Sequence, residues 1–187
     1  MFSRIGVIGA GAMGRGIALL FAQAGEQIQL YDTRAEAIEQ ALAFNRDLLQ
    51  RSLAKGRITA EQLDATMARM QPAHTLAEMA GCDLLIEAIV EILDVKQKLF
   101  VELEALVGPE AILATNTTSL SVTAIARACD GRPDRHRALV AALGELYLER
   151  ARAHGCRLDD AGVLRVLGMD IELNAQGLAC WLDRAKP

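Results

Sequence analysis

A glycine motif near the amino terminus constrains the fold of this chain more than any other feature. Gly9, Gly11 and Gly14 follow an apolar run over residues 4–8 and precede a helical pattern over 13–24. The first glycine of such a motif permits a tight turn, the second lets a pyrophosphate approach the backbone, and the third lets helix and strand pack closely. We therefore predict a strand, a turn and a helix that bind a dinucleotide. The predicted cofactor contacts here are Gly9, Ala10, Gly11, Ala12, Met13 and Gly14.

An acidic residue ends the next predicted strand. Gly25 stops the first helix, and residues 27–32 alternate polar and apolar up to Asp32, about 20 residues beyond the motif. A carboxylate there accepts hydrogen bonds from the ribose hydroxyls and repels the extra phosphate of NADP, so the sequence predicts NAD as the cofactor. NADP stays an alternative because Arg34 could reach that phosphate. The remaining alternative is that the glycines only form a turn and Asp32 only caps a helix.

Strand and helix patterns continue in alternation after this first unit. A long helical pattern over 33–54, with Thr33 as its N-cap, and a second helix from Thr59 predict a helical hairpin inserted after the second strand. Residues 84–88 and 111–116 have the apolar character of buried strands, and a helix is predicted between them over 95–106. The alternation predicts an α/β Rossmann-type, doubly wound and mostly parallel sheet.

The character of the chain changes after Pro133. We place the boundary of the NAD-binding domain at Arg135, so that this domain covers 1–135 and a tail covers 136–187. The tail is rich in Ala, Leu and Arg, and its spacing predicts short helices over about 137–153 and 172–184.

Composition narrows the class of protein. Of the 187 residues 52% are hydrophobic and 24% are charged, a balance typical of a packed globular chain. The net charge of −4 comes without a block of Lys and Arg, so neither nucleic acid nor a membrane is an expected partner. No metal site is predicted. The four cysteines lie far apart, which predicts buried thiols in a reducing compartment, and with no leader or membrane span recognised we expect the cytoplasm.

Two further stretches carry a family resemblance. Residues 86–91 read Ile-Glu-Ala-Ile-Val-Glu and continue through Lys96 to Phe100, and residues 114–120 read Ala-Thr-Asn-Thr-Thr-Ser-Leu. Together with the glycine motif, they resemble the N-terminal domain of the 3-hydroxyacyl-CoA dehydrogenases over about residues 4–135. The resemblance implies an NAD-dependent oxidoreductase that moves a hydride between C3 of a 3-hydroxyacyl-CoA and C4 of nicotinamide.

The resemblance also implies roles for individual residues. Ala88 and Ile89 would line the cofactor, and Glu91 and Lys96 would lie near its nicotinamide end. Asn116 would hold both nicotinamide and substrate in place.

Two substrate contacts are implied in the same way. Thr118 stands where the family usually has a serine whose hydroxyl meets the 3-oxygen of the substrate, and Ser119 is a neighbouring alternative. Lys55 matches a region that in relatives touches the CoA phosphates. The other interpretation of Lys55 is a solvated lysine before Gly56.

The resemblance stops after Arg135. Family members continue with a strand whose His-Phe-Phe-Asn-Pro run carries the catalytic histidine, held by a glutamate, and with a helical substrate domain. This chain has Val140 at the position of that histidine. His136 lies nearby in the sequence, but it lacks the Phe-Phe-Asn-Pro run and is predicted to begin a helix rather than end a strand. His74 and His154 have flanking sequences typical of loops or helix ends and are interpreted as surface or half-buried histidines. Loss of a positioned general base lowers the rate about 10² to 10⁴-fold. We therefore expect the chain to bind NAD but to turn over substrate slowly.

Two alternative functions remain open at this point. One is a nonenzymatic NAD-binding or assembly module whose tail docks a partner. The other is a dehydrogenase of the 3-hydroxyisobutyrate type, which shares the Gly-x-Gly-x-Met-Gly opening, although the stretch around Asn116 argues against it. Apolar residues of the tail, including Trp181, could pack on the NAD-binding domain or on a second copy of the chain, so a homo-oligomer is a further possibility.

Overall fold

The central strands form because their apolar runs are buried on both faces. All four residues of β1 (Ile5–Ile8) and of β4 (Leu84–Glu87) are buried, which is the pattern of inner strands in a parallel sheet. The strand order is β3-β2-β1-β4-β5, and all neighbours pair in parallel. The remaining strands of this sheet are β2 (Ile28–Tyr31), β3 (Met70–Ala73) and β5 (Ile112–Thr115).

The computed structural model describes residues 2–108, 111–117, 120–129, 163–166 and 169–172. The chain divides into two compact units, Met1–Arg132 and Pro133–Pro187. The first unit holds the five-stranded sheet and all described helices.

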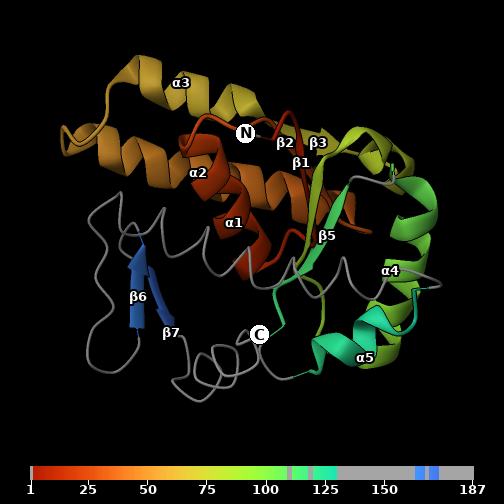
Figure 1. Ribbon diagram of the computed structural model, residues 1–187. Helices are drawn as coiled ribbons and strands as arrows, with labels where there is room; N and C mark the ends of the chain where they lie inside the picture. Colours follow the sequence, from red (N-terminus) through yellow and green to blue (C-terminus); the bar gives the residue numbers. More distant parts are fainter. Residues whose placement is uncertain (1, 109–110, 118–119, 130–162, 167–168, 173–187) are drawn as a thin grey trace. The chain divides into compact units, whose positions relative to one another are not determined.

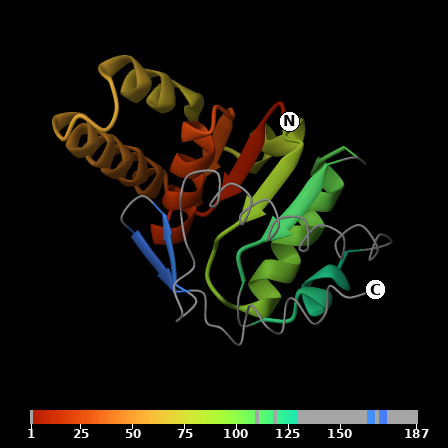
Figure 2. The ribbon, with the colours of Figure 1, turned by 60° about the vertical axis from the view of Figure 1, so that its left-hand side comes forward.

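Helices connect the strands and cover both faces of the sheet (Figures 1 and 2). In the first unit they are α1 (Ala12–Gln23), α2 (Ala35–Ala54), α3 (Ala60–Arg69), the 3-10 helix η1 (Leu76–Gly81), α4 (Leu93–Leu106) and α5 (Val122–Ala126). The first three lie on one side of the sheet, and α4 and α5 lie on the other (Figure 2). Adjacent residues of β1 point to opposite faces of the sheet. Val7 faces Gly14 of α1, and Ile8 packs in a cluster with Phe100 and Leu103 of α4.

Parallel pairing in register brings the carboxyl ends of the strands to one edge. Ile8 at the end of β1 pairs with Tyr31 of β2 and with Glu87 of β4, and Glu87 pairs with Thr115 of β5. The residues that directly follow these strands therefore lie together, in the place where open α/β sheets bind their ligands.

The structure confirms the parallel α/β sheet and the inserted helical hairpin. Thr59 begins α3 with a complete capping box, in which its hydroxyl accepts from the Gln62 backbone N–H and the Gln62 side chain accepts from the Thr59 backbone N–H. The predicted N-cap at Thr33 is wrong. The N-cap of α2 is Arg34, whose guanidinium has no acceptor and makes no capping hydrogen bond, and the Asp32 carboxylate accepts the Arg34 N–H.

Four features of the structure were not predicted from the sequence: β3, η1, α5 and a hairpin in the second unit. That hairpin consists of β6 (Val163–Val166) and β7 (Met169–Glu172), which pair antiparallel. The helix predicted over 137–153 lies outside the described residues. The helix predicted from 172 begins at the last residue of β7, and the rest of it also lies outside them.

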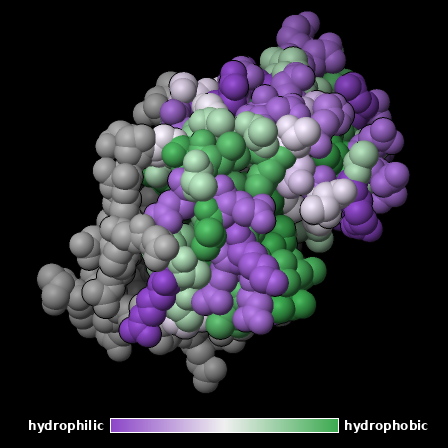
Figure 3. Space-filling view, turned by 90° about the vertical axis from the view of Figure 1, so that its right-hand side faces the viewer, coloured by the Kyte–Doolittle hydropathy of each residue, from purple (hydrophilic) through white to green (hydrophobic). Residues whose placement is uncertain are grey.

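Other expectations concern the thiols and the surface. Cys82 and Cys129 are buried, as predicted, and Cys82 is a free thiol, while Cys156 and Cys180 lie outside the described residues. Of the helices in the described ranges, none combines the length and apolar character needed to cross a bilayer. The face in Figure 3 mixes hydrophobic with hydrophilic groups. Exposed large apolar residues of the turn after β4 and of α4 are Val90, Ile92, Val95 and Val101.

Candidate functional site

The glycine turn after β1 is formed by close backbone contacts. Gly9 has φ +103°, and a Cβ added there would lie 2.6 Å from the carbonyl oxygen of Ala88. A Cβ on Gly14 would lie 1.7 Å from the carbonyl oxygen of Gly9. These two positions therefore require glycine for reasons internal to the fold.

The middle glycine has a different environment. A Cβ on Gly11 would meet nothing within 4 Å, and the residue is exposed. Gly11 is also the N-cap of α1, and no side chain caps this helix or supplies an acid in its first turn. Ala12 and Met13, which open α1, are exposed as well, whereas Ala10 is buried. An open glycine beside an uncapped helix amino terminus suits an anion such as a pyrophosphate.

Asp32 connects the end of β2 to the glycine turn. Its Oδ2 accepts from the Ala10 backbone N–H at 2.8 Å, and its Oδ1 accepts from the Arg34 backbone N–H at 3.0 Å. The Arg34 side chain is 76% exposed, and its Nε lies 3.9 Å from Oδ1. Each carboxylate oxygen can accept a further hydrogen bond, so Asp32 can support the turn and still bind ribose hydroxyls. The alternative was that the glycines only form a turn and Asp32 only caps a helix. The hydrogen bonds of Asp32 to the Ala10 and Arg34 N–H groups are present, and they leave the carboxylate able to bind a cofactor as well.

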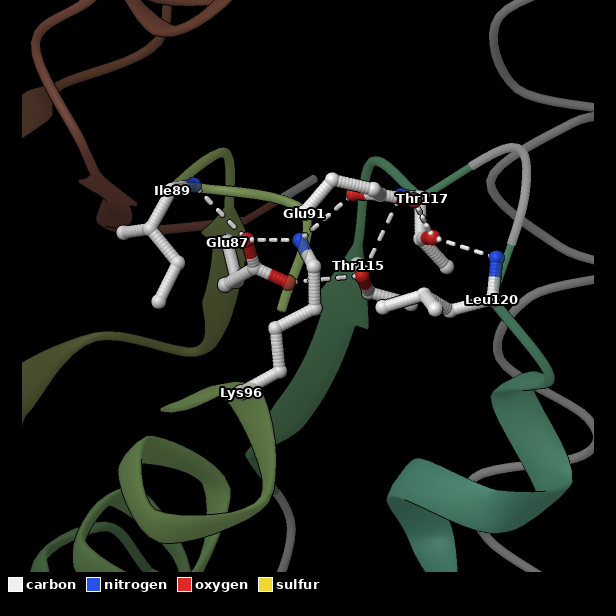
Figure 4. Close-up of polar contacts among 7 residues, drawn as sticks. All are labelled: Glu87, Ile89, Glu91, Lys96, Thr115, Thr117 and Leu120. Carbon is white, nitrogen blue, oxygen red and sulfur yellow. Dashed lines mark hydrogen bonds and ion pairs between the residues drawn. The ribbon is translucent and has the colours of Figure 1, made fainter. Parts of the chain in front are cut away.

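A buried ion pair lies at the ends of β4 and β5 (Figure 4). The side chains of Glu87 and Lys96 are 0% and 1% exposed, and Nζ of Lys96 lies 2.6 Å from Oε1 of Glu87. Glu87 also accepts from the Ile89 N–H at 2.7 Å and from the Thr115 hydroxyl at 2.7 Å. The charged groups are therefore paired and hydrogen-bonded, as buried charges must be.

The same ion pair extends toward solvent through Glu91. Nζ of Lys96 lies 3.1 Å from Oε2 of Glu91, whose side chain is 40% exposed. The Thr117 hydroxyl donates to Glu91 and accepts from the Leu120 N–H at 3.1 Å. Asn116, between Thr115 and Thr117, donates its backbone N–H to the carbonyl oxygen of Glu87 at 2.8 Å. One network thus joins the turn after β4, the start of α4 and the turn after β5 (Figure 4).

Comparison with known proteins decides the family. A family model described as "3-hydroxyacyl-CoA dehydrogenase, NAD binding domain" matches residues 4–141. The chain belongs to this family. The comparison confirms the resemblance and the NAD cofactor, and it favours this family over the 3-hydroxyisobutyrate type.

Relatives of this 3-hydroxyacyl-CoA dehydrogenase domain match a similar stretch. A 3-hydroxybutyryl-CoA dehydrogenase of Bradyrhizobium diazoefficiens is 42% identical over 135 residues, which are 72% of this chain and 46% of that protein. A 3-hydroxyadipyl-CoA dehydrogenase of Escherichia coli K12 is 42% identical over 122 residues, 65% of this chain and 26% of that protein. The crystal structure of a 3-hydroxybutyryl-CoA dehydrogenase from E. coli aligns with TM-score 0.70 and 39% identity over 72% of this chain and 28% of that one. The chain spans less than half the length of these relatives.

The 3-hydroxyacyl-CoA dehydrogenase domain brings most of the predicted site residues to one edge of the sheet. The glycine turn, Asp32, Ala88, Ile89 and Asn116 directly follow β1, β2, β4 and β5, and Glu91 and Lys96 adjoin them through the ion pair. Thr118 and Ser119 lie outside the described residues, as do His136 and Val140.

Lys55 is not part of this group. It is exposed and forms the C-cap of α2, a helix of 20 residues that starts near Asp32. Such a helix is about 30 Å long, so Lys55 lies well away from the glycine turn. Its proposed contact with CoA phosphates remains a prediction.

Sequence reasoning missed Glu87, Thr115 and Thr117. A signal was available for two of them, because Glu87 ends an otherwise apolar buried strand and Thr115 ends the neighbouring one. A fully buried acid needs partners, and a parallel sheet supplies them from the next strand. Within the described residues, no group of three or more His, Cys, Asp and Glu side chains could hold a metal ion.

Proposed function

We propose that this chain binds NAD along the carboxyl edge of its sheet and serves the interconversion of a 3-hydroxyacyl-CoA and a 3-oxoacyl-CoA. The observation that carries the proposal is the match of residues 4–141 to the NAD-binding domain of that dehydrogenase family. The open Gly11, the uncapped α1 and the position of Asp32 fit the cofactor.

Each half of the cofactor has its own set of residues in this proposal. The glycine turn and the amino terminus of α1 bind the pyrophosphate, and Asp32 binds the adenine-side ribose. Ala88, Ile89, Glu91 and Lys96 bind the nicotinamide half. When bound, NAD supplies the hydride acceptor for the reaction.

Two residues after β5 contact the substrate. Asn116 holds nicotinamide and substrate together, and the hydroxyl of Thr118 meets the 3-oxygen of the acyl group. Lys55 contacts the CoA phosphates from the helical hairpin. The acyl-CoA substrate is supported by the names of the relatives, which include a 3-hydroxybutyryl-CoA and a 3-hydroxyadipyl-CoA dehydrogenase.

In this proposal the chain binds NAD but turns over substrate slowly. The family resemblance places the general base at a histidine, and the chain has Val140 at that position. Loss of a positioned base lowers the rate by about 10² to 10⁴. The same substitution supports the second candidate function, an NAD-binding or assembly module without turnover, whose tail binds a partner or a second copy of the chain.

The cellular setting is also a proposal. Cys82 is a free thiol in the interior, which is the usual state of cysteine in the reducing cytoplasm. We place the chain there, with no nucleic acid or membrane partner, since its charge is mixed along the sequence.

The test is calorimetric titration with NADH and with NADPH, followed by an acetoacetyl-CoA turnover assay on the same sample. We expect NADH to bind more tightly than NADPH and turnover to be negligible. Absence of NADH binding would refute the proposed function. Robust turnover would show that another residue serves as the base, and His136 would be the first residue to substitute.

A further inference from the structure

Glu87 is a residue to which the family resemblance assigns no role. Its carboxylate is completely buried at the last position of β4, so it cannot itself touch a ligand bound at the surface. A buried carboxylate is costly to keep charged, and three donors offset that cost: the Ile89 N–H, Nζ of Lys96 and the Thr115 hydroxyl.

The three donors come from three separate segments. Ile89 lies in the turn after β4, Lys96 in α4 and Thr115 at the end of β5, so one side chain fixes the relative positions of all three (Figure 4). Through Lys96 it also holds Glu91, and Glu91 in turn accepts from Thr117. These are the segments that surround the nicotinamide side of the proposed site.

The position of the network in the sheet assigns it to one half of the cofactor. The strand order is β3-β2-β1-β4-β5, so the glycine turn and Asp32 lie on the β1–β2 side, and Glu87 and Thr115 lie on the β4–β5 side. A dinucleotide crosses such a sheet between β1 and the strand where the order reverses, with one nucleotide on each side. A change at Glu87 should therefore disturb one nucleotide and spare the other.

We propose that Glu87 is a positioning residue for the nicotinamide half of the cofactor, acting through the Ile89 backbone, Lys96 and Thr115. This inference rests on the proposed function, since it assumes that NAD is bound at this edge. Glu87 neutralises the buried ammonium of Lys96 and leaves Glu91 as the member of the ion-pair group that reaches solvent.

The decisive variant is Glu87→Gln, which keeps the size of the side chain and removes its charge. The amide oxygen can still accept from Ile89, and the amide nitrogen can donate to the Thr115 hydroxyl, but Lys96 loses its buried counter-charge. We expect NADH affinity to fall about ten-fold or more, while affinity for ADP, which contacts only the β1–β2 side, changes less than about two-fold. Both are measured by calorimetry on the full chain.

One control and one second test variant separate positioning from general damage. Glu102→Gln removes an exposed acid from α4 and should change neither affinity. Thr115→Val keeps the ion pair and removes a hydroxyl that donates to Glu87 and accepts from the Thr117 N–H at 3.2 Å. It should lower NADH affinity about three-fold without affecting ADP, and it serves if Glu87→Gln fails to fold.

The outcomes distinguish this inference from the proposed function. Equal losses of NADH and ADP affinity, or no loss of either, would overturn the role of Glu87. If the unmodified chain binds no NADH, the proposed function fails, and hydrogen exchange at the Ile89 amide then tests Glu87 alone. In Glu87→Gln the Ile89 N–H donates to a neutral amide oxygen, a weaker acceptor than the carboxylate, so we expect faster exchange at Ile89, with the Gly9 amide, which donates to Tyr31, unchanged. Unchanged protection at Ile89 would refute the inference.

Discussion

At the scale of single residues, the three glycines of the turn have separate tasks. Gly9 and Gly14 are required by the backbone, since an added Cβ would lie 2.6 Å from Ala88 and 1.7 Å from Gly9 respectively. Gly11 has open space around it, so only a ligand would require it to be glycine. Stability and cofactor affinity should therefore respond differently to substitution within the same motif.

The first prediction compares Gly14→Ala with Gly11→Ala. The Gly14 variant must displace backbone, and we expect it to lower the free energy of unfolding by about 2 to 3 kcal/mol. The Gly11 variant should keep its stability and bind NADH more weakly, because the methyl group enters the space used by the pyrophosphate. Urea unfolding and NADH titration of both variants measure the two effects. Equal destabilisation by the two substitutions would contradict the assignment.

A second prediction concerns the cofactor choice at Asp32. In Asp32→Asn the amide oxygen can still accept the Ala10 N–H, but the charge that repels a ribose phosphate is gone. We expect the ratio of NADPH to NADH affinity to rise about ten-fold, mainly by weaker NADH binding. Asp64→Asn, an exposed position on α3, is the control. A ratio that stays constant would remove Asp32 from the determinants of specificity.

A third prediction follows from the interior thiol. Burial raises the pKa of Cys82 from 9.0 to about 11. Because the folded chain holds the proton more tightly than the unfolded one, this contribution to stability is complete below pH 9 and is lost as the pH rises through about 11. Chemical unfolding of the wild type and of Cys82→Ala between pH 8 and about 11 should show a steeper decline for the wild type. Parallel declines would contradict the assignment.

At the scale of elements, a capping box determines where α3, the second helix of the hairpin, begins. Thr59 and Gln62 exchange two hydrogen bonds at the start of α3, and Leu63, Thr66 and Met67 bury the inner face of that helix. The box was recognisable because threonine stands three residues before glutamine. The first residue of α2 was not, since its N-cap is Arg34, whose side chain cannot accept a hydrogen bond, rather than Thr33.

The fourth prediction concerns this capping box. Thr59→Ala removes the acceptor for the Gln62 N–H, and we expect a loss of about 1 kcal/mol in the free energy of unfolding. Hydrogen exchange should accelerate at Gln62. Asp64→Ala, at an exposed position in the interior of the same helix, should change the free energy of unfolding by less than about 0.5 kcal/mol. Equal losses from the two substitutions would mean that the box contributes nothing to α3.

Other elements lacked a local signal. The strand β3 contains Pro72 and has only its two end residues buried, so its sequence is not strand-like. It is a strand because it pairs in parallel with β2. Glu87 was overlooked for a related reason, since its partners Lys96 and Thr115 come from other elements. The glycine turn and Asp32 were predictable because their motif is local and follows a fixed order along the chain.

At the scale of the whole molecule, the proposed cofactor site belongs to the first of the two units. All described residues that we assign to NAD lie between Gly9 and Asn116, within Met1–Arg132. The sheet and the hydrophobic cluster that contains Ile8, Phe100 and Leu103 lie there too. The chain divides at Arg132, and the domain boundary at Arg135 stays a prediction.

The last prediction is that a fragment ending at Arg132 folds and binds NADH. Its sheet has all five strands, and the cluster around Leu113 and Phe100 is complete with Ile125 and Cys129 near its end. We expect one cooperative unfolding transition and an NADH affinity within about two-fold of the full chain, because no assigned contact lies beyond residue 132. Circular dichroism and calorimetry measure both. A fragment that folds but binds NADH ten-fold more weakly, about 1.4 kcal/mol, would mean that residues 133–187 contribute directly to the cofactor site.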